Sequence, residues 1–259
     1  MFAHGLLGGC PRLRELPSGF VTEAPFRLGR VVDAAARPVL LVVPLLDWSA
    51  PGGEAAFGPG HARWHRLGHP AVLDAVVTEA LAEAGRVQQR PGPAVRELAL
   101  AAHSRAYDVL EPLAAHRSDP AIQQGALARL RHIWAFDTTY AGNVPAWIDW
   151  LATDPELRMH VFYRADYRPG RNTGTIGDRF AARQGGRLTV TRATEGHCAV
   201  PATRLAQVLG VTGAGSSGAG SSGTGSTGSD ATEFEDADAL DPDLSAVAGL
   251  DDATWGGPQ

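Results

Sequence analysis

The stretch Val95–Ala115, VRELALAAHSRAYDVLEPLAA, decides the fold of this chain. It opens with an apolar run, Leu98–Ala102, which is short enough to form a buried strand. The chain then turns at Ser104 and continues with apolar residues spaced as on one face of a helix. These residues are Tyr107, Val109, Leu110, Leu113 and Ala114. The pattern therefore predicts a strand that breaks sharply into a helix at a serine.

Such a turn is crowded, so the residues two positions before and two positions after the serine must be small. Here they are Ala102 and Ala106. The turn lifts the Ser104 hydroxyl off the sheet, and the N–H groups at the start of the helix point toward whatever binds there. The competing interpretation is that Ser104 caps the N-terminus of an ordinary helix.

The segment Ala102–Ala106, AHSRA, stands where Gly-x-Ser-x-Gly is usual in the α/β-hydrolase superfamily. On this motif the chain resembles that superfamily. The resemblance implies that Ser104 is a nucleophile, activated by a histidine that an acidic side chain orients. It also implies hydrolysis of an ester or amide bond through an acyl-enzyme.

Apolar runs alternate with helical patterns along the chain. Strands are predicted at residues 39–43, 98–102, 132–136, 159–163 and 188–191, and helices at 70–84, 107–114, 119–131, 145–151, 176–182 and 201–209. The run at 39–43, VLLVV, is typical of a central parallel strand. Residues 1–30 are expected to be irregular, with one short edge strand at most. Together these elements predict an α/β fold in three layers, with helices on both faces of a mostly parallel sheet.

Polar residues follow four of the predicted strands. Ser104 follows the second strand, Asp137 the third, Asp166 the fourth and His197 the last. These side chains can converge because the carboxyl ends of parallel strands meet at one edge of a sheet. The order serine, acid, histidine is also that of the α/β-hydrolase superfamily. The alternatives are a surface-loop histidine and ordinary turn aspartates. His103, although next to Ser104, is expected to be structural.

Two aspartates compete for the role of the acid. In most of the superfamily the acid follows the next-to-last strand, which favours Asp166; in some members it follows the strand after the nucleophile, which favours Asp137. The segment Phe136–Gly142, FDTTYAG, with Trp147 and Thr173–Thr175, is similar to a group of largely uncharacterised bacterial hydrolase-like proteins. Some of those proteins accompany phage-tail-like injection systems. This resemblance covers roughly residues 95–200 and favours Asp137, with Asp166 as the alternative acid.

An oxyanion hole would use the backbone N–H of Arg105 and a second N–H from Leu45 or Leu46. The His-Gly pair that is usual at the second position is absent, and Pro44–Asp47, PLLD, stands there instead. A long loop, Pro44–Gly60, follows, and such loops bind ligands in α/β sheets. The residues expected to contact substrate are Asp47, Trp48, His65 and Tyr140.

The histidines His61, His65 and His69 are spaced by four, as metal ligands on one helix face are. Glycine and proline residues interrupt any helix long enough to hold all three, and no cysteine or HExxH motif completes a site. We therefore expect no metal and no cofactor. With Arg63 and Arg66, this segment forms either a basic wall for an anionic substrate or a solvated loop.

The net charge of the 259 residues is −5. Nine acidic and no basic residues lie in 230–259, so the remainder has 23 basic against 19 acidic residues, an excess too small to indicate nucleic acid. No apolar run reaches the roughly 18 residues of a membrane span. The N-terminus lacks the pattern of a secretory signal, and Cys10 and Cys198 do not make a disulfide framework. We expect a cytoplasmic protein, with export through another kind of signal as the alternative.

Composition divides the chain into a hydrolase-like domain at 1–211, a flexible Gly/Ser-rich linker at 212–229 and an acidic tail at 230–259. The tail is expected to be disordered and to dock a protein partner or its own domain. The sequence thus predicts a serine hydrolase that uses Ser104, His197 and Asp137 on a small-molecule ester or amide. The alternative is an inactive hydrolase-like scaffold, used for binding or as cargo of a secretion or injection system.

Overall fold

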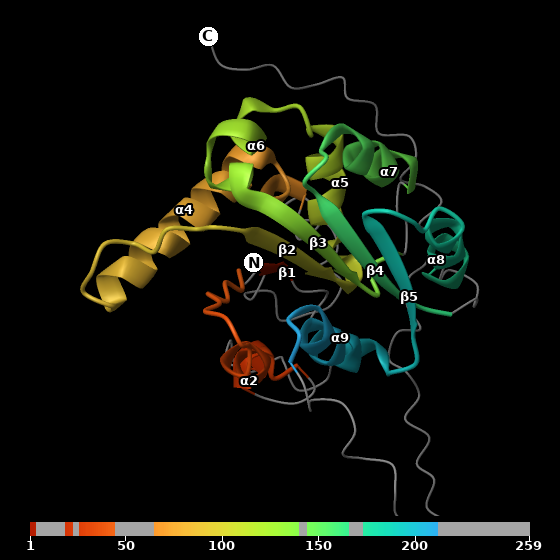
Figure 1. The fold of residues 1–259 in the computed structure, drawn as a ribbon, viewed down its shortest axis with the longest axis horizontal. Helices are drawn as coiled ribbons and strands as arrows, with labels where there is room; N and C mark the ends of the chain where they lie inside the picture. Colours follow the sequence, from red (N-terminus) through yellow and green to blue (C-terminus); the bar gives the residue numbers. More distant parts are fainter. Residues whose placement is uncertain (4–18, 23–25, 45–64, 140–143, 166–172, 212–259) are drawn as a thin grey trace, which may run out of the picture.

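A sheet of five parallel strands forms the centre of the structure, a computed structural model that describes residues 1–3, 19–22, 26–44, 65–139, 144–165 and 173–211. The strands lie across the sheet in the order β1 (Phe2–Ala3), β2 (Leu98–His103), β3 (Leu130–Phe136), β4 (Arg158–Arg164) and β5 (Leu188–Ala193) (Figure 1). His103 is level with Phe136, and Phe136 is level with Phe162. The carboxyl ends of β2, β3 and β4 therefore meet at one edge.

Helices cover both faces of this sheet (Figure 1). One face carries α4 (Pro70–Val87), α5 (Tyr107–Ala115), α6 (Pro120–Gln124), α7 (Val144–Thr153) and α8 (Thr173–Ala181). The other face carries α2 (Leu28–Asp33), with α1 (Gly19–Thr22) packed beside it, and α9 (Val200–Val208). The structure confirms the predicted α/β fold, a parallel sheet between two helical layers.

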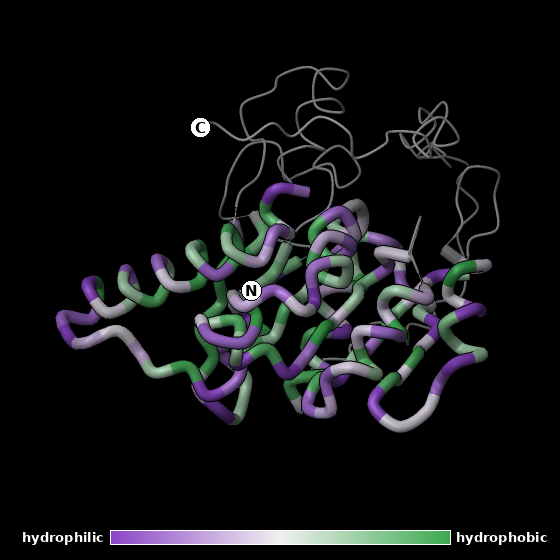
Figure 2. The backbone as a smooth tube through the Cα atoms, turned by 90° about the horizontal axis from the view of Figure 1, so that it is seen from above, coloured by the Kyte–Doolittle hydropathy of each residue, from purple (hydrophilic) through white to green (hydrophobic). Residues whose placement is uncertain are grey.

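Successive residues of the central strands face the two helical layers in turn. Leu100 and Ile133 pack in the core on the α5 side, whereas Ala101 and Trp134 pack in the core on the α9 side. Both sets are apolar, which explains why these strands read as continuous apolar runs rather than as alternating patterns. Figure 2 shows hydrophobic segments through the middle of the domain and hydrophilic turns along the outer helices.

The prediction of a strand at 39–43 is wrong. Residues 39–44 form no strand, and Leu40 is 45% exposed. The place beside β2 is taken by β1, whose Phe2 N–H donates to the carbonyl oxygen of Val42 at 2.8 Å. Three residues of this segment pack against the core on the α9 side, namely Val39, Leu41 and Val43. An apolar run of this length does not distinguish a partly buried segment packed on the core from a paired strand.

The helix predicted at 119–131 is shorter than expected. α6 ends at Gln124, the 3₁₀ turn η3 (Ala126–Arg129) follows, and β3 begins at Leu130. Asp74 of α4 holds this turn, because its Oδ1 accepts the Leu127 N–H at 2.9 Å. Gly125 is extended between α6 and this turn, so the predicted helix is interrupted there.

The predicted linker at 212–229 and the predicted acidic tail at 230–259 lie outside the described residues. Among the helices that the structure does describe, none combines the length and the hydropathy needed to cross a bilayer.

Candidate active site

The chain turns sharply at Ser104, between β2 and the 3₁₀ turn η2 (Ser104–Ala106) that leads into α5. Ser104 has a φ of 55°, a conformation that costs a residue with a side chain about 1–3 kcal/mol. Ala102 and Ala106 are both 0% exposed, so a larger side chain at either position would meet core atoms. The N-cap of α5 is Ala106 and not Ser104. The predicted strand–turn–helix is present, and Ser104 is not an ordinary helix cap.

Asp137 follows β3 directly and is 1% exposed. Its Oδ2 lies 2.7 Å from Nδ1 of His197, and its Oδ1 accepts the backbone N–H of Arg164 at 3.1 Å. Its own N–H donates to the carbonyl oxygen of Phe162 at 2.7 Å. Like Ser104, Asp137 has a positive φ, here 44°. The carboxylate is therefore buried, with a partner on each oxygen, and its backbone is held by β4.

His197 opens the 3₁₀ turn η4 (His197–Ala199), which joins β5 to α9. Its side chain is 15% exposed. Because a carboxylate only accepts hydrogen bonds, the contact with Asp137 places a proton on Nδ1 of His197. In the neutral ring Nε2 is then an acceptor, which is the form that can take a proton from a hydroxyl group.

Two further contacts join the Ser104 turn to this pair. The Thr138 hydroxyl donates to the carbonyl oxygen of Ser104, and Nε2 of His103 lies 3.2 Å from the carbonyl oxygen of His197. The structure thus brings the backbone of Ser104 to the same sheet edge as Asp137 and His197, as their positions after three parallel strands predict.

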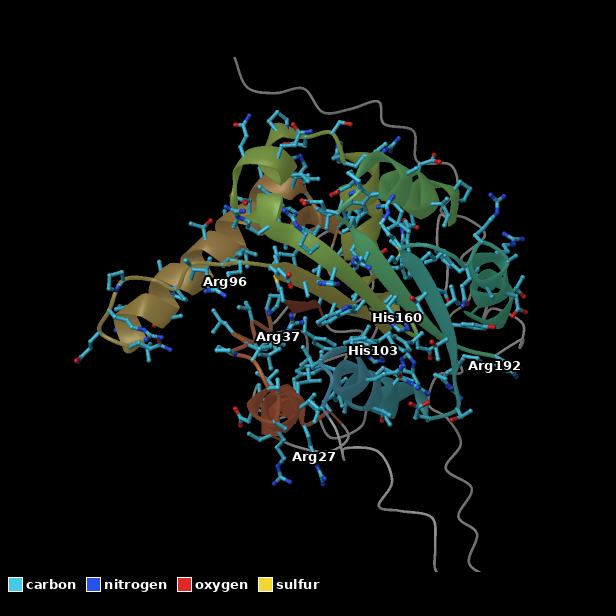
Figure 3. All side chains as sticks on the ribbon, in the orientation of Figure 1. Arg27, Arg37, Arg96, His103, His160 and Arg192 are labelled. Atoms are coloured by element: carbon cyan, nitrogen blue, oxygen red, sulfur yellow. The ribbon has the colours of Figure 1, made fainter. Side chains whose placement is uncertain are left out.

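Sequence reasoning did not identify His103 and Thr138 as parts of this constellation. Each is the neighbour of a predicted site residue, Ser104 or Asp137, and that adjacency is the signal that the sequence contains. The sequence does not give the register of the sheet, which places the end of β2 beside the end of β3 and so brings these residues together. Figure 3 shows His103 at the side of the sheet that faces α9.

An ion pair braces the loop that carries His197. Nε of Arg204 on α9 lies 2.7 Å from Oε1 of Glu195, and its Nη2 donates to Oε2 at 2.8 Å. Glu195 also accepts the N–H of Thr194 at 2.8 Å. Burial opposes ionisation of the carboxyl, but hydrogen bonds from Arg204 and from the backbone outweigh it and lower the pKa of Glu195. At neutral pH the carboxylate is ionised and ties the loop to α9.

His160 belongs to the α9 face of β4 (Figure 3). Its ring stacks on Phe162 with centroids 4.0 Å apart, and its Nε2 lies 3.2 Å from Oγ1 of Thr191. Burial, and then the charge of Arg204, lower the pKa of His160 to about 4. At pH 7 this ring is neutral and packs as part of the sheet surface.

Several of the predicted site residues fall outside the described residues, namely Asp166, Leu45, Leu46, Asp47, Trp48 and Tyr140. Arg105 is the middle residue of η2, so its backbone N–H lies in the turn after Ser104. His65 is exposed, in a helical turn at 65–67 ahead of α4. In the part of the chain that the structure describes, no three His, Cys, Asp or Glu side chains are grouped so that they could hold a metal ion.

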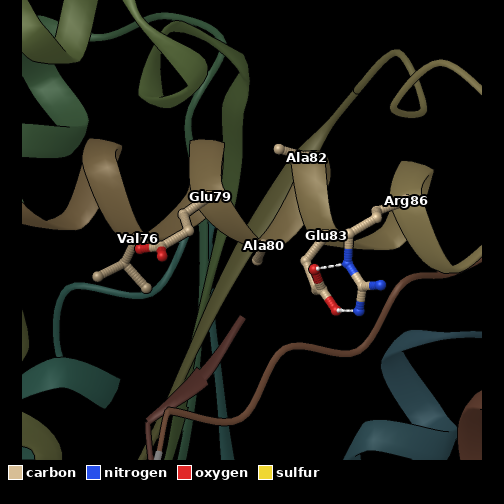
Figure 4. A pocket seen from close by; sticks show the side chains of 6 residues that line it. All are labelled: Val76, Glu79, Ala80, Ala82, Glu83 and Arg86. Atoms are coloured by element: carbon tan, nitrogen blue, oxygen red, sulfur yellow. Dashed lines mark hydrogen bonds and ion pairs between the residues drawn. The ribbon is translucent and has the colours of Figure 1, made fainter.

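A cavity of about 510 Å³ lies along α4, away from these residues (Figure 4). Its lining consists of Val76, Glu79, Ala80, Ala82, Glu83 and Arg86. Glu83 and Arg86 pair across one turn of the helix, with Nε donating to Oε2 at 2.7 Å. A single helix supplies the whole lining, so this cavity is an open depression that shares no residue with the site.

Cys198, the residue after His197, is disulfide-bonded. The other cysteine of the chain is Cys10, which lies outside the described residues. Disulfides persist in oxidising compartments and are rare in the cytosol. Between the two locations considered from the sequence, this bond favours export through another kind of signal, and the cytoplasmic location stays a prediction.

Comparison of the chain with protein-family models, with curated proteins and with solved structures gave no match.

Proposed function

We propose that this domain is a serine hydrolase that cleaves an ester or amide bond through an acyl-enzyme. The observation that carries the proposal is the 2.7 Å contact between the buried Asp137 and His197, beside a serine held at positive φ. Residues other than glycine that adopt a strained backbone conformation are concentrated at active sites. A carboxylate–histidine pair next to a strained serine is the arrangement that activates a hydroxyl nucleophile.

In the proposed reaction, Nε2 of His197 takes the proton of the Ser104 hydroxyl while Oγ attacks the carbonyl carbon of the substrate. His197 then gives this proton to the leaving alcohol or amine as the bond to the leaving group breaks. Nε2 of His197 then takes a proton from water as the water oxygen attacks the acyl carbon. The bond between that carbon and Oγ breaks, the acid product leaves, and His197 returns the proton to Oγ of Ser104. Asp137 stays ionised throughout, keeps the proton on Nδ1 and stabilises the imidazolium.

The oxyanion formed in each step would accept hydrogen bonds from the backbone N–H of Arg105 and from that of Leu45 or Leu46. One donor of this kind contributes about 100- to 1000-fold in rate. The N–H of Arg105 suits this role because it follows the nucleophile directly at the start of the turn into α5.

An α/β-hydrolase-like fold is part of the proposal. It is supported by the sharp turn at Ser104 and by the order of Ser104, Asp137 and His197 after successive parallel strands. The proposed substrate is a small-molecule ester or amide, and the reaction needs no cofactor. The proposed location is the cytoplasm, with export through another kind of signal as the alternative that the disulfide at Cys198 favours.

A fluorophosphonate probe tests the proposal. The wild-type protein is expected to be labelled and to hydrolyse p-nitrophenyl acetate, whereas Ser104→Ala does neither. Ser118→Ala, which removes the exposed hydroxyl just after α5, is the matched control and should behave as wild type. Unlabelled wild-type protein, or unchanged turnover by Ser104→Ala, would contradict the proposal.

The second candidate is an inactive hydrolase-like scaffold used for binding or as cargo of a secretion or injection system. The segment Pro44–Asp47 favours it, because the His-Gly pair usual in the oxyanion hole is missing there. The same probe separates the two candidates, since a folded scaffold without activity leaves the probe unreacted.

A further inference from the structure

We propose that His103 is a positioning residue that holds His197 in place for proton transfer from Ser104, an inference that rests on the proposed function. His103 is the last residue of β2, and it is 2% exposed. A central strand of the sheet therefore fixes its backbone, and the surrounding core leaves its ring little room to move.

The ring of His103 contacts two aromatic side chains. Its centroid lies 4.5 Å from that of His197 at an interplanar angle of 33°, and 5.5 Å from that of Phe26 at 75°. Rotation of the His103 ring would displace one of these neighbours. One side of the His197 ring is thus covered by a group that the sheet holds in position.

The second contact between the two histidines is polar. Nε2 of His103 lies 3.2 Å from the carbonyl oxygen of His197, and a carbonyl oxygen only accepts, so Nε2 of His103 donates. His103 therefore contacts both the side chain and the main chain of His197. The contact of Asp137 with Nδ1 sets the rotation of the ring, whereas the contacts of His103 set the position of the whole residue.

The proposed chemistry favours a neutral ring at this place. When His197 becomes an imidazolium, a neutral ring beside it adds no charge repulsion. A cation at the same distance would repel it instead. An imidazole that donates through Nε2 supplies the hydrogen bond and the ring together, which neither an aliphatic nor a cationic side chain does.

Three substitutions in the full-length protein separate these contributions. His103→Gln keeps a donor near the position of Nε2, His103→Phe keeps the ring, and His103→Leu keeps neither. With p-nitrophenyl acetate we expect His103→Leu to lose about 10- to 100-fold in kcat with little change in KM, because a small displacement of His197 impairs proton transfer. His103→Gln and His103→Phe should each recover part of this loss.

A purely structural role would lower the melting temperature and leave kcat of the folded protein unchanged. Val77→Ala, a truncation of a buried side chain on α4, is the control for this behaviour. The acid limb of the kcat/KM profile, which reports the protonation of His197 in the proposed reaction, is expected to shift in His103→Leu and not in Val77→Ala.

A folded His103→Leu variant with the kcat and the pH profile of wild type would overturn the inference. If that variant does not fold, wild-type kcat in both His103→Gln and His103→Phe overturns it equally. Failure of the proposed function is a separate result, because the wild-type protein itself would then neither react with the fluorophosphonate nor hydrolyse the ester.

Discussion

Asp137 and His197 are 60 residues apart in the chain, and Oδ2 of the first lies 2.7 Å from Nδ1 of the second. Strand β4 lies between the strands that precede these two residues, and the N–H of its Arg164 donates to Oδ1 of the same carboxylate at 3.1 Å. Three neighbouring strands therefore position this single carboxylate, which is buried and cannot turn away without losing a hydrogen bond. Such a group orients the imidazole that it contacts and stabilises its protonated form.

Replacement of this carboxylate is the most direct test of its role. Asp137→Asn leaves the shape of the side chain but offers an amide where Nδ1 of His197 needs an acceptor, so the ring adopts the wrong tautomer. We expect kcat for p-nitrophenyl acetate to fall by about 1,000- to 10,000-fold.

Asp178→Asn is the matched control for this substitution, since Oδ1 of Asp178 accepts the Tyr163 hydroxyl at 2.9 Å on another part of the domain. It should retain wild-type kcat. Unchanged kcat in Asp137→Asn would exclude Asp137 as the acid, and Asp166→Asn would then be the variant to measure.

The strain at Ser104 predicts an unusual order of stability. A glycine tolerates the φ of 55°, whereas an alanine does not. We expect Ser104→Gly to be more stable than Ser104→Ala by about 1 kcal/mol in urea unfolding, although both variants are inactive. At the exposed Ser118 the same pair should show the opposite order or no difference. A less stable Ser104→Gly would mean that the turn is not strained.

His160 predicts a loss of stability on mild acidification. Its pKa is about 4 in the folded protein, against about 6.5 in the unfolded chain. Above pH 6.5 both states are neutral; between pH 6.5 and 4 the unfolded state binds a proton that the folded state refuses, so the free energy of unfolding falls. The full effect is at most about 3 kcal/mol and is reduced because His160 is only half-buried.

Urea unfolding at pH 7 and at pH 4.5 measures this effect. The decrease between the two pH values should be smaller in His160→Phe, which cannot titrate, than in wild type. Equal decreases in the two proteins would show that His160 does not resist protonation when the chain is folded.

The disulfide at Cys198 predicts sensitivity to reductant. Because this bond adjoins His197, its reduction should lower both the melting temperature and ester turnover, with a loss of unfolding free energy of about 2–4 kcal/mol. Thermal melts with and without tris(2-carboxyethyl)phosphine measure it. Cys198→Ser should melt at the temperature of reduced wild type and respond to reductant no further. A wild-type melt that reductant leaves unchanged would argue against the bond.

The sequence by itself predicted the turn at Ser104, the parallel strands and the edge at which they end. The small residues Ala102 and Ala106 predicted a tight turn at Ser104, because a crowded turn excludes larger side chains. Apolar runs separated by helical patterns predicted parallel strands covered on both faces, because strands in such a sheet are buried on both sides. The order of polar residues after these strands predicted one shared edge, because parallel strands all end on the same side.

Only the tertiary structure decided which groups touch. The prediction of a strand at 39–43 was wrong because the same apolar pattern suits a segment packed on the core, and β1 took the place beside β2. The contacts of His103 with His197 and of Thr138 with Ser104 were not predicted either. These pairings depend on strand register and on the path of the chain into α9, and both are set by contacts between residues far apart in the sequence.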